Sequence, residues 1–409
     1  MSHGARIVVV GIGADGWEGL APPAREAILA ADEVIGSPRQ LELLAADAPR
    51  GRAWPSPMAP MLDELVAREE GTVCVLASGD PMLHGIGATL AARLPGDRLT
   101  VIGHVSAFAL ACARMAWPAA EVELVSAVAR PVDVLARVLQ PRRRIVVYST
   151  GSDGARAVAA LLCARGYGDS RFVVLEQLGG RAERVIEASA RDWGERPVDP
   201  LHAIAIECLR DPATSLHALV PGLPDSAFES DGALTKRAVR AVTLASLAPT
   251  PGALLWDVGA GSGSIAIEWL RAERDVRAIA VEQREDRAGR IARNALALGV
   301  PSLQVVTGKA PAVLGGLDAP DAVFVGGGVT VAGVLAECWK SLVSGGRIVA
   351  NAVTLEGEHV LAAAHAEHGG ELVRLEVSRA EPIGAFTAWR AQMPVVQWSC
   401  EKAPEAAVR

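Results

Sequence analysis

The sequence lacks the features that favour a nucleic-acid-binding or membrane-spanning protein. Its 409 residues carry 40 basic and 47 acidic side chains, a formal net charge of −7. Neither half, split near residue 225, has the basic excess that attracts a phosphate backbone. No apolar run reaches the ~18–20 residues needed to cross a bilayer. We therefore expect neither nucleic acid nor a membrane as a partner.

Cysteines are few and scattered. The six cysteines form no Cys-x-x-Cys pair, and none has a histidine at a metal-ligand spacing. This pattern argues against structural zinc and a dense disulfide framework, so we predict no metal site and free thiols in a reducing compartment. The N-terminus has no basic-then-apolar leader, which predicts a cytoplasmic protein.

Short apolar runs alternate with amphipathic stretches along the chain. This alternation predicts an α/β fold with parallel sheets. In the first half the predicted strands are Ile7–Val10, Val73–Ala77, Leu99–Ile102, Ile145–Tyr148, Phe172–Leu175 and Ala203–Glu207. The predicted helices there include Pro22–Ala31, Met61–Glu70 and Gly154–Arg165.

A break follows Arg210. Residues 211–231 are rich in proline, glycine and polar side chains and are predicted to form a linker between domains 1–210 and 232–409. The second domain is predicted to open with a helix over Leu234–Leu247. Its seven predicted strands are Leu254–Val258, Ala278–Glu282, Leu303–Val306, Ala322–Val325, Arg347–Ala350, Leu372–Val377 and Met393–Trp398, the last as an antiparallel edge strand.

The most informative motif runs from Leu254 to Ser264. An apolar strand ends in Asp257, a Gly-x-Gly-x-Gly turn follows over residues 259–263, and a helix opens at Ser264. Glycines allow close approach of a ligand and positive φ, and a helix start offers free N–H groups. Glu282 ends the next strand, where a carboxylate can accept both hydroxyls of a ribose. The pattern predicts a nucleotide-sized site.

A second glycine pattern, Gly11-Ile12-Gly13-Ala14-Asp15-Gly16, matches the Gly-x-Gly-x-x-Gly spacing of dinucleotide sites. In such sites a helix opens at the glycines, whereas the helical pattern here begins only at Pro22. A plain turn without a ligand is the simpler interpretation of these residues alone. Three further strand ends carry small or polar residues: Ser78–Pro81, His104–Phe108 and Ser149–Gly151.

Together these residues resemble two families. Residues 6–209, with Gly11–Gly13, Gly79-Asp80-Pro81 and Ser106–Phe108, resemble the tetrapyrrole methylases, a fold of two α/β subdomains. Residues 232–400, with Leu234–Arg237, the 256–264 loop, Gly326–Gly328 and Gly384–Thr387, resemble class I Rossmann-like methyltransferases with a seven-stranded sheet. His84 departs from the first pattern, where an aromatic residue is common.

The resemblance implies an S-adenosylmethionine site in each half. For the first half the implied cofactor residues are Gly11, Gly13, Gly79, Asp80, Leu83, Ser106 and Ala107. For the second half they are Thr235, Asp257, Gly259, Ala260, Gly261, Ser262, Gly263, Glu282, Lys309 and Ala310. Asp257 would brace the loop or reach the cofactor amine through water. Lys236 and Arg237 are weaker candidates for substrate contacts, because they equally suit a solvated helix start.

The pairing of both families in one chain is similar to bifunctional methyltransferases of cobalamin biosynthesis. It implies a homo-oligomeric enzyme acting on precorrin-6B, a reduced tetrapyrrole with many carboxylates. The first half would methylate C-5; the second would methylate C-15 and remove carbon dioxide from the C-12 acetate. No catalytic side chain is identified.

Two alternatives stay open at this point. One is a nicotinamide-dependent oxidoreductase that uses the Gly11–Gly16 loop. The other is a tetrapyrrole-binding protein with one silent half. Trp256, Trp269 and Trp389 are predicted to be core residues rather than stacking platforms for a ligand.

Overall fold

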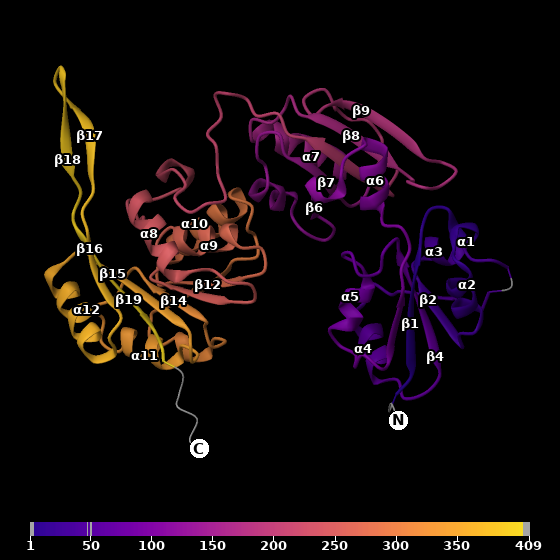
Figure 1. Ribbon diagram of the computed structural model, residues 1–409, viewed down its shortest axis with the longest axis horizontal. Coiled ribbons are helices and arrows are strands. Elements are labelled where there is room, and N and C mark those ends of the chain that lie inside the picture. The colour runs from indigo at the N-terminus through magenta and orange to yellow at the C-terminus, as the bar shows by residue number, and fades with distance from the viewer. Residues whose placement is uncertain (1–3, 47, 50, 404–409) are drawn as a thin grey trace. The chain divides into compact units, whose positions relative to one another are not determined.

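The computed structural model describes residues 4–46, 48–49 and 51–403 (Figure 1). These residues form two compact units. Unit 1 contains the chain up to residue 132 together with 141–214. Unit 2 contains residues 133–140 and the chain from 215 onward. A short segment from the first half of the sequence therefore belongs to unit 2.

Unit 1 begins with a parallel sheet in the order β3-β2-β4-β1-β5. Its strands are β1 (Arg6–Ile12), β2 (Glu33–Gly36), β3 (Gly51–Ala53), β4 (Thr72–Ser78) and β5 (Leu99–Ile102). The helices are α1 (Gly16–Gly19), α2 (Pro22–Leu29), α3 (Pro38–Glu42), α4 (Ala59–Ala67) and α5 (Ile86–Ala91). The central strands are continuous apolar runs because helices cover both faces: α4 and α5 pack on one, and α2 on the other.

A second sheet of unit 1 has the order β6-β7-β10-β8-β9. Its strands are β6 (Val122–Ser126), β7 (Arg144–Tyr148), β8 (Arg171–Glu176), β9 (Arg184–Ser189) and β10 (His202–Glu207). Its helices are α6 (Ala107–Met115) and α7 (Gly154–Ala164), with short 3-10 turns at Ala119–Glu121 and Val132–Arg137. Only β6 and β7 pair in parallel; the other pairs are antiparallel. The expectation of a parallel sheet is wrong here, because β8, β9 and β10 follow one another without crossover helices.

Unit 2 contains a seven-stranded sheet in the order β13-β12-β11-β14-β15-β19-β16. Its strands are β11 (Leu254–Val258), β12 (Arg277–Glu282), β13 (Gln304–Thr307), β14 (Ala322–Val325), β15 (Arg347–Ala352), β16 (Glu371–Leu375) and β19 (Val395–Glu401). The helices are α8 (Arg237–Leu247), α9 (Ser264–Ala272), α10 (Glu285–Ala297), α11 (Val334–Ser341) and α12 (Leu355–His368), with 3-10 turns at Asp225–Ala227 and Leu314–Gly316. All seven predicted strands are confirmed, and the architecture is the predicted α/β class.

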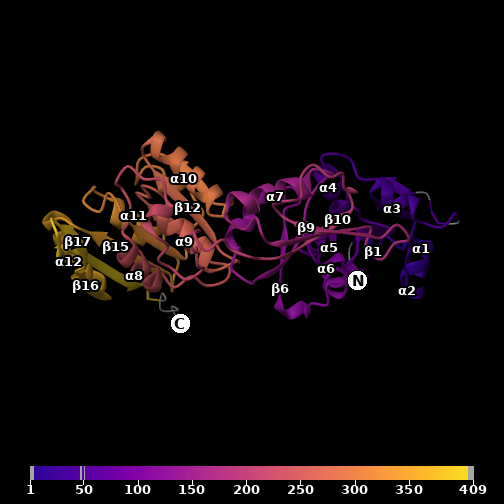
Figure 2. The same cartoon turned by 90° about the horizontal axis from the view of Figure 1, so that it is seen from above.

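Alternating side chains of this sheet build two cores. Leu255, Ala280 and Phe324 face α8, α9 and α10, whereas Trp256 and Val323 face α11 and α12. Figures 1 and 2 show these helices in layers on the two sides of the sheet. The sheet is therefore covered on both faces, and its strand ends are the edge left for a ligand.

The last strand lies inside the sheet rather than at its edge. β19 pairs antiparallel with β15 on one side and with β16 on the other. The predicted antiparallel direction is confirmed, but the predicted edge position is wrong. β16 occupies the edge because β19, the last strand along the chain, inserts between β15 and β16.

Two strands, β17 (Ser378–Ile383) and β18 (Phe386–Ala391), form a hairpin that extends beyond the sheet, drawn in yellow in Figure 1. Every residue of both strands is exposed. Trp389, predicted to be a core residue, is 77 % exposed on this hairpin, so that prediction is wrong. Trp256 and Trp269 are buried as predicted.

The predicted linker contains packed structure in its second part. Leu223 and Phe228 are buried in the core of unit 2. The Glu268 carboxylate, itself buried, accepts hydrogen bonds from the backbone N–H groups of Gly222 (2.5 Å) and Leu223 (3.0 Å). The buried Arg240 pairs with Glu268 at 2.5 Å and with Asp225 at 3.2 Å. These contacts fix residues 222–228 to α8 and α9.

Among the described residues, none of the helices combines the length and apolarity required to pass through a membrane.

Candidate functional site

A cavity of about 580 Å³ in unit 1, here called the unit 1 cavity, lies where strands of both sheets end. Ser78 reaches it from the end of β4, and Tyr148 from the end of β7. Leu175 of β8 and Ala203 of β10, both in the second sheet, also line the cavity. The cavity thus requires both sheets of the unit.

Most residues predicted for the first cofactor site meet at this cavity. Those that line it are Gly13, Gly79, Asp80, Leu83, Ser106 and Ala107. Gly11 does not line the cavity but packs directly against Gly79, because a Cβ atom at Gly11 would lie 2.1 Å from the Gly79 carbonyl oxygen. Gly79 has a φ of 60°, which disfavours other residues. The end of β1 can approach the Gly79 loop this closely only because residue 11 is a glycine.

Asp80 and Ser106 also organise their own loops. Asp80 Oδ1 accepts a hydrogen bond from the Met82 N–H at 2.9 Å. Ser106 Oγ caps α6 by accepting from the Ala109 N–H at 3.1 Å. The other Asp80 carboxylate oxygen has no recorded partner among the described residues, so it can accept from a ligand.

Several polar residues of this cavity escaped the sequence prediction. Tyr148 Oη accepts from the Phe108 N–H at 2.7 Å, and burial raises the pKa of Tyr148 to about 12. Ser149 Oγ lies 2.8 Å from His202 Nε2, while His202 Nδ1 lies 2.7 Å from the Asp199 carbonyl oxygen. Because a carbonyl only accepts, Nδ1 carries the proton and Ser149 donates to Nε2. Ser149–Gly151 is recognisable in the sequence as a polar strand end. Nothing in the sequence indicates that His202 lies beside Ser149.

The Gly11–Gly16 loop does not open a long helix. α1 spans only Gly16–Gly19, and α2 begins at Pro22 after a break. The short α1 was not predicted, but it leaves the conclusion unchanged. A dinucleotide site needs a helix whose N-terminus faces the pyrophosphate, and this loop lacks one.

The glycine loop of unit 2 connects β11 to α9. Gly259, Gly261 and Gly263 have φ values of 71°, 60° and 73°, all in the left-handed region. A Cβ atom on Gly259 would lie 2.6 Å from the carbonyl oxygen of Gly327, in the loop after β14. The loop can therefore follow this path only with glycines, and it leaves its backbone open to a ligand.

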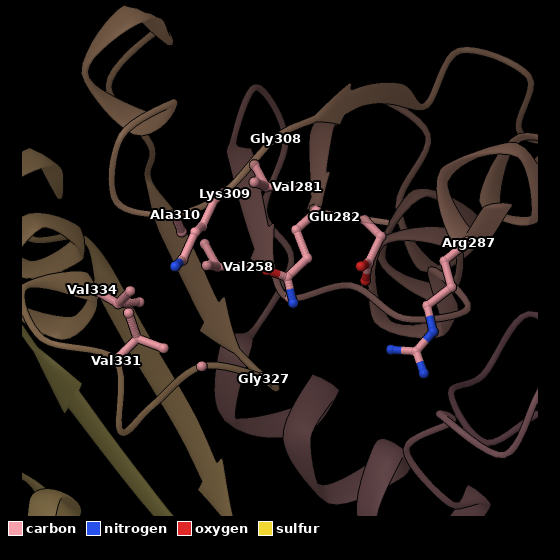
Figure 3. A pocket seen from close by; sticks show the side chains of 13 residues that line it. Val258, Val281, Glu282, Arg287, Gly308, Lys309, Ala310, Gly327, Val331 and Val334 are labelled. Atoms are coloured by element: carbon pink, nitrogen blue, oxygen red, sulfur yellow. The ribbon is translucent and has the colours of Figure 1, made fainter. Parts of the chain in front are cut away.

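Two adjoining cavities flank this loop. The Glu282 cavity, about 280 Å³, is lined by residues that include Glu282, Lys309 and Ala310. Figure 3 shows Glu282, Arg287 and Lys309 around it, each from a different element. The Asn351 cavity, about 530 Å³, is lined by residues that include Thr235, Lys236, Gly259, Ala260, Gly261 and Asn351. Gly259, Gly327 and Arg287 line both, so the two cavities are continuous.

Glu282 is buried at the end of β12 and holds two backbone groups. Its Oε2 accepts from the Gly261 N–H at 2.9 Å, and its Oε1 from the Arg284 N–H at 3.0 Å. A solvated acid at a strand end would make neither contact. Each oxygen retains a second lone pair that can accept from a ligand.

Four residues predicted for the site line neither cavity, as far as the described residues show: Asp257, Ser262, Gly263 and Arg237. Asp257 Oδ2 accepts from the Ala266 N–H at 3.1 Å, while the buried Oδ1 has no partner in the described part of the chain. Burial, assisted by the charge of Glu282, raises the pKa of Asp257 to about 7. Ser262 Oγ donates to the Ala233 carbonyl at 2.8 Å. The Asp257 contact ties the end of β11 to α9, while its predicted roles, bracing the glycine loop or reaching the cofactor amine, stay predictions.

Arg287 and Asn351 are cavity residues that the sequence did not reveal. Asp231 faces three arginines: Arg287 at 2.9 Å, Arg290 at 3.3 Å and Arg284 at 3.9 Å. The hydrogen bond from Arg287 lowers the pKa of the Asp231 carboxyl. Arg284 also pairs with Asp286 at 2.8 Å, and Arg290 lies 4.0 Å from the same carboxylate, so these charges largely compensate one another. No group of three or more metal-ligating side chains occurs in the part of the chain that the structure describes.

Comparisons with known proteins assign both units to methyltransferase classes. Residues 6–193 match the Tetrapyrrole (Corrin/Porphyrin) Methylases, and residues 226–402 match the Precorrin methyltransferase domain. A precorrin-6Y C(5,15)-methyltransferase [decarboxylating] of Sinorhizobium sp is 46% identical over 97% of this chain and 96% of its own length. The chain belongs to the family of precorrin-6Y C(5,15)-methyltransferases (decarboxylating).

Two further relatives match about half of the chain. A cobalt-precorrin-7 C(5)-methyltransferase of Salmonella typhimurium is 31% identical over 44% of this chain and 88% of its own length. The crystal structure of the C-terminal domain of precorrin-6Y C5,15-methyltransferase from Rhodobacter capsulatus is 47% identical, with a TM-score of 0.43, and covers 46% of this chain and all of that one. The oxidoreductase alternative finds no support in these relatives or in the Gly11–Gly16 loop.

Proposed function

We propose that this protein is a bifunctional S-adenosylmethionine-dependent methyltransferase acting on precorrin-6B in cobalamin biosynthesis. Unit 1 methylates C-5. Unit 2 methylates C-15 and removes carbon dioxide from the C-12 acetate. The observation that carries the proposal is the pair of separate cavities, each beside a glycine loop and a strand-end carboxylate, in a chain 46% identical to a relative of that name.

The residues present fit S-adenosylmethionine in both units. In unit 2, Gly259 and Gly261 keep the loop free of side chains, and Glu282 offers acceptors for ribose hydroxyls. The unpartnered, buried Asp257 Oδ1 suits a donor or a water molecule behind the loop. In unit 1, Asp80 and the Gly11–Gly79 contact form the comparable edge. This arrangement supports the proposal of two cofactor sites per chain.

When bound, the cofactor supplies an already activated methyl group, so the protein needs no nucleophile of its own. Its residues hold both partners in alignment, which can contribute ~7–11 kcal/mol to lowering the barrier. In each unit, packing of the macrocycle against an apolar wall would also exclude water. Leu175 belongs to such a wall in unit 1, and Phe324 belongs to one in unit 2.

The proposed substrate carries many carboxylates, and basic residues at the unit 2 cavities suit them. Lys236 lines the Asn351 cavity, and Arg287 lines both cavities. We assign Lys236 and Arg287 to substrate carboxylates. Arg237 was a candidate on sequence grounds, but its backbone N–H bonds Asp225 at 2.9 Å and it lines neither cavity; it is the weaker choice.

The two activities are proposed to follow the two domains, residues 1–210 and 232–409. The half-length relative named for C(5) methylation alone supports this division. Incubation of the full chain with precorrin-6B and S-adenosylmethionine should yield a product with two added methyl groups and one carbon dioxide lost, as read by mass spectrometry. Tetrapyrrole binding without any methyl gain would instead favour a binding protein. Calorimetry that finds one cofactor site per chain would indicate a silent half.

We also propose a homo-oligomer in the cytoplasm, in which β17–β18 contacts a second copy of the chain. Phe386 is 79 % and Ile383 63 % exposed on a hairpin with no third strand beside it among the described residues. Replacing Phe386 and Trp389 by serine should lower the mass seen in sedimentation. Val220→Ser, at another exposed apolar residue, is the matched control. An unchanged mass would place the contact elsewhere.

A further inference from the structure

A chain of buried polar side chains lies beneath the Asn351 cavity. The buried Gln397 of β19 stands directly opposite Asn351 of β15 in the antiparallel register. Gln397 Nε2 donates to Asn351 Oδ1 and to Thr243 Oγ1, both at 2.9 Å. Asn351 Nδ2 donates to Thr243 Oγ1 at 3.1 Å. Three elements, α8, β15 and β19, therefore fix the orientation of the Asn351 amide.

This network accounts for all but one of the polar hydrogens on the two amides. Both hydrogens of Gln397 Nε2 are donated, and Gln397 Oε1 accepts from Ser246 Oγ at 3.2 Å. Asn351 Nδ2 carries two hydrogens and donates one. The other has no acceptor among the described residues, and its side chain lines the cavity. Asn351 thus presents one oriented N–H donor to a ligand.

The sheet strands around that donor are otherwise apolar, and the other uncharged polar lining residues, Thr235 and Gln392, lie in loops. Among the described lining residues that lie within strands of the sheet, Asn351 is the only polar one; the others are Phe324, Leu375 and Val395. The charged residues of the cavity, Lys236 and Arg287, come from the start of α8 and from α10. Of these, Arg287 is already paired with Asp231 at 2.9 Å. The sheet side of the cavity therefore offers a carboxylate one neutral donor.

Such a setting favours loss of carbon dioxide. A carboxylate moved from water to an apolar wall loses hydration, and one neutral N–H compensates for only part of that loss. Carbon dioxide is uncharged and pays no such penalty. A cation at the same place would stabilise the carboxylate and oppose its loss.

We propose that Asn351 binds the C-12 acetate carboxylate of the substrate through its remaining Nδ2–H and holds it for decarboxylation. This inference rests on the proposed function. The bond between the acetate methylene and the carboxylate carbon breaks, and its electron pair passes into the conjugated imine of the macrocycle. Carbon dioxide leaves, and a proton from water forms the new C–H bond of the methyl group. Gln397 and Thr243 are positioning residues for Asn351.

The test follows carbon dioxide loss by the full chain, with precorrin-6B and S-adenosylmethionine, by mass spectrometry. At substrate concentrations below saturation Asn351→Leu should slow the loss about 10- to 150-fold, because the acetate is no longer held at the apolar wall; this is the range for a hydrogen bond to a charged group. C-5 methylation, assigned to unit 1, serves as an internal control and should be unchanged. Ser341→Ala, in α11 and outside both the network and the cavities, is the control and should retain the wild-type rate.

Asn351→Asp distinguishes a role of Asn351 in binding the acetate from a role in stabilising the fold. Its oxygens can still accept from Gln397, and the Thr243 hydroxyl can turn to donate. An ionised aspartate repels the acetate, whereas a protonated one donates an O–H, so decarboxylation should recover as pH falls. A structural role would give Asn351→Asp and Asn351→Leu the same pH profile.

If the wild-type protein releases carbon dioxide and both Asn351 variants release it at the same rate, the proposed function stands and this inference is overturned. Identical pH profiles of the two variants would overturn it as well. Wild-type protein that releases no carbon dioxide from precorrin-6B would overturn the proposed function, and the inference with it.

Discussion

The carboxylate of Glu282 accepts a hydrogen bond from the backbone N–H of Gly261 at 2.9 Å, and this bond joins the end of β12 to the glycine loop. The proposed cofactor residue Glu282 is therefore bonded directly to the glycine loop. Loss of its carboxylate would remove the proposed ligand contact and also release a loop whose left-handed glycines have many other conformations available.

Glu282→Ala should weaken S-adenosylmethionine binding in unit 2 by about 30- to 150-fold, which corresponds to about 2–3 kcal/mol. The reason is the loss of charge-assisted hydrogen bonds to ribose, partly replaced by water. Calorimetry of the full chain should show one weakened site and one intact site. Glu282→Gln keeps the acceptor for Gly261 and should fall between wild type and alanine. Two undiminished sites in folded Glu282→Ala would remove this residue from the cofactor site.

Asp80→Ala should impair C-5 methylation and spare C-15 methylation. The substitution removes the acceptor for the Met82 N–H and the free carboxylate oxygen at the unit 1 cavity. Asp80→Asn retains the first of these and serves as the control for loop structure. Both methylations are read from the product mass after limited turnover. Unchanged C-5 methylation in Asp80→Ala would move the first cofactor site elsewhere.

A fragment that begins at Ser215 should be more stable than one that begins at Ser226. The longer fragment retains Leu223, which is 2 % exposed, and the two backbone donors to the buried Glu268. Burial of one leucine contributes ~1.5–3 kcal/mol and each hydrogen bond to a charged group a similar amount. We expect a difference of at least about 3 kcal/mol in urea unfolding. Both fragments lack residues 133–140, so the comparison is matched; equal midpoints would show that residues 215–225 add nothing.

Asp257→Asn should change how the stability of unit 2 depends on pH. Burial raises the pKa of Asp257 from an ordinary 3.8 to about 7, so the folded state binds a proton that the unfolded state has lost between these values. Stability contributed by the neutral acid is thus complete below about pH 4 and lost as pH rises toward 7. At about 1.4 kcal/mol per pH unit the total is roughly 4 kcal/mol.

The asparagine variant keeps an acceptor for the Ala266 N–H and does not titrate. Its stability relative to wild type should therefore increase from pH 5 to pH 8 in the 215–409 fragment. A constant difference across this range would show that Asp257 is already ionised in the folded protein at low pH.

The central strands of the unit 2 sheet, β11, β12, β14 and β15, were predictable because each contains a run of buried apolar residues. Strands of other kinds were missed: β9 reads Arg-Val-Ile-Glu-Ala-Ser and is half exposed, and β3 has three exposed residues. Periodicity detects burial, so a strand that buries little leaves no pattern. The prediction for Trp389 was wrong because a large aromatic side chain usually indicates a buried position. The sequence does not show that the hairpin carrying Trp389 extends beyond the sheet.

The candidate sites were predictable where a motif is local and not where the fold assembles it. Glu282 follows the glycine loop within one strand-helix-strand unit, so its place could be inferred. His202 and Ser149 are 53 residues apart and meet only through antiparallel pairing of neighbouring strands. Asn351, Gln397 and Thr243 likewise depend on β19 lying inside the sheet, which no local pattern specifies.

The interior place of β19 has a consequence for synthesis on the ribosome. The nascent chain makes β15 and β16 first. In this sheet order β15 can pair with β14, but its other edge and β16 must wait until residues 395–401 have emerged. Unit 1 is complete in sequence by residue 214 and can fold while translation continues. Unit 2 cannot close its sheet, or orient Asn351, until the ribosome has nearly finished. A premature stop before β19 would therefore release a chain with one folded methylase unit attached to an open sheet whose unpaired strand edges favour aggregation.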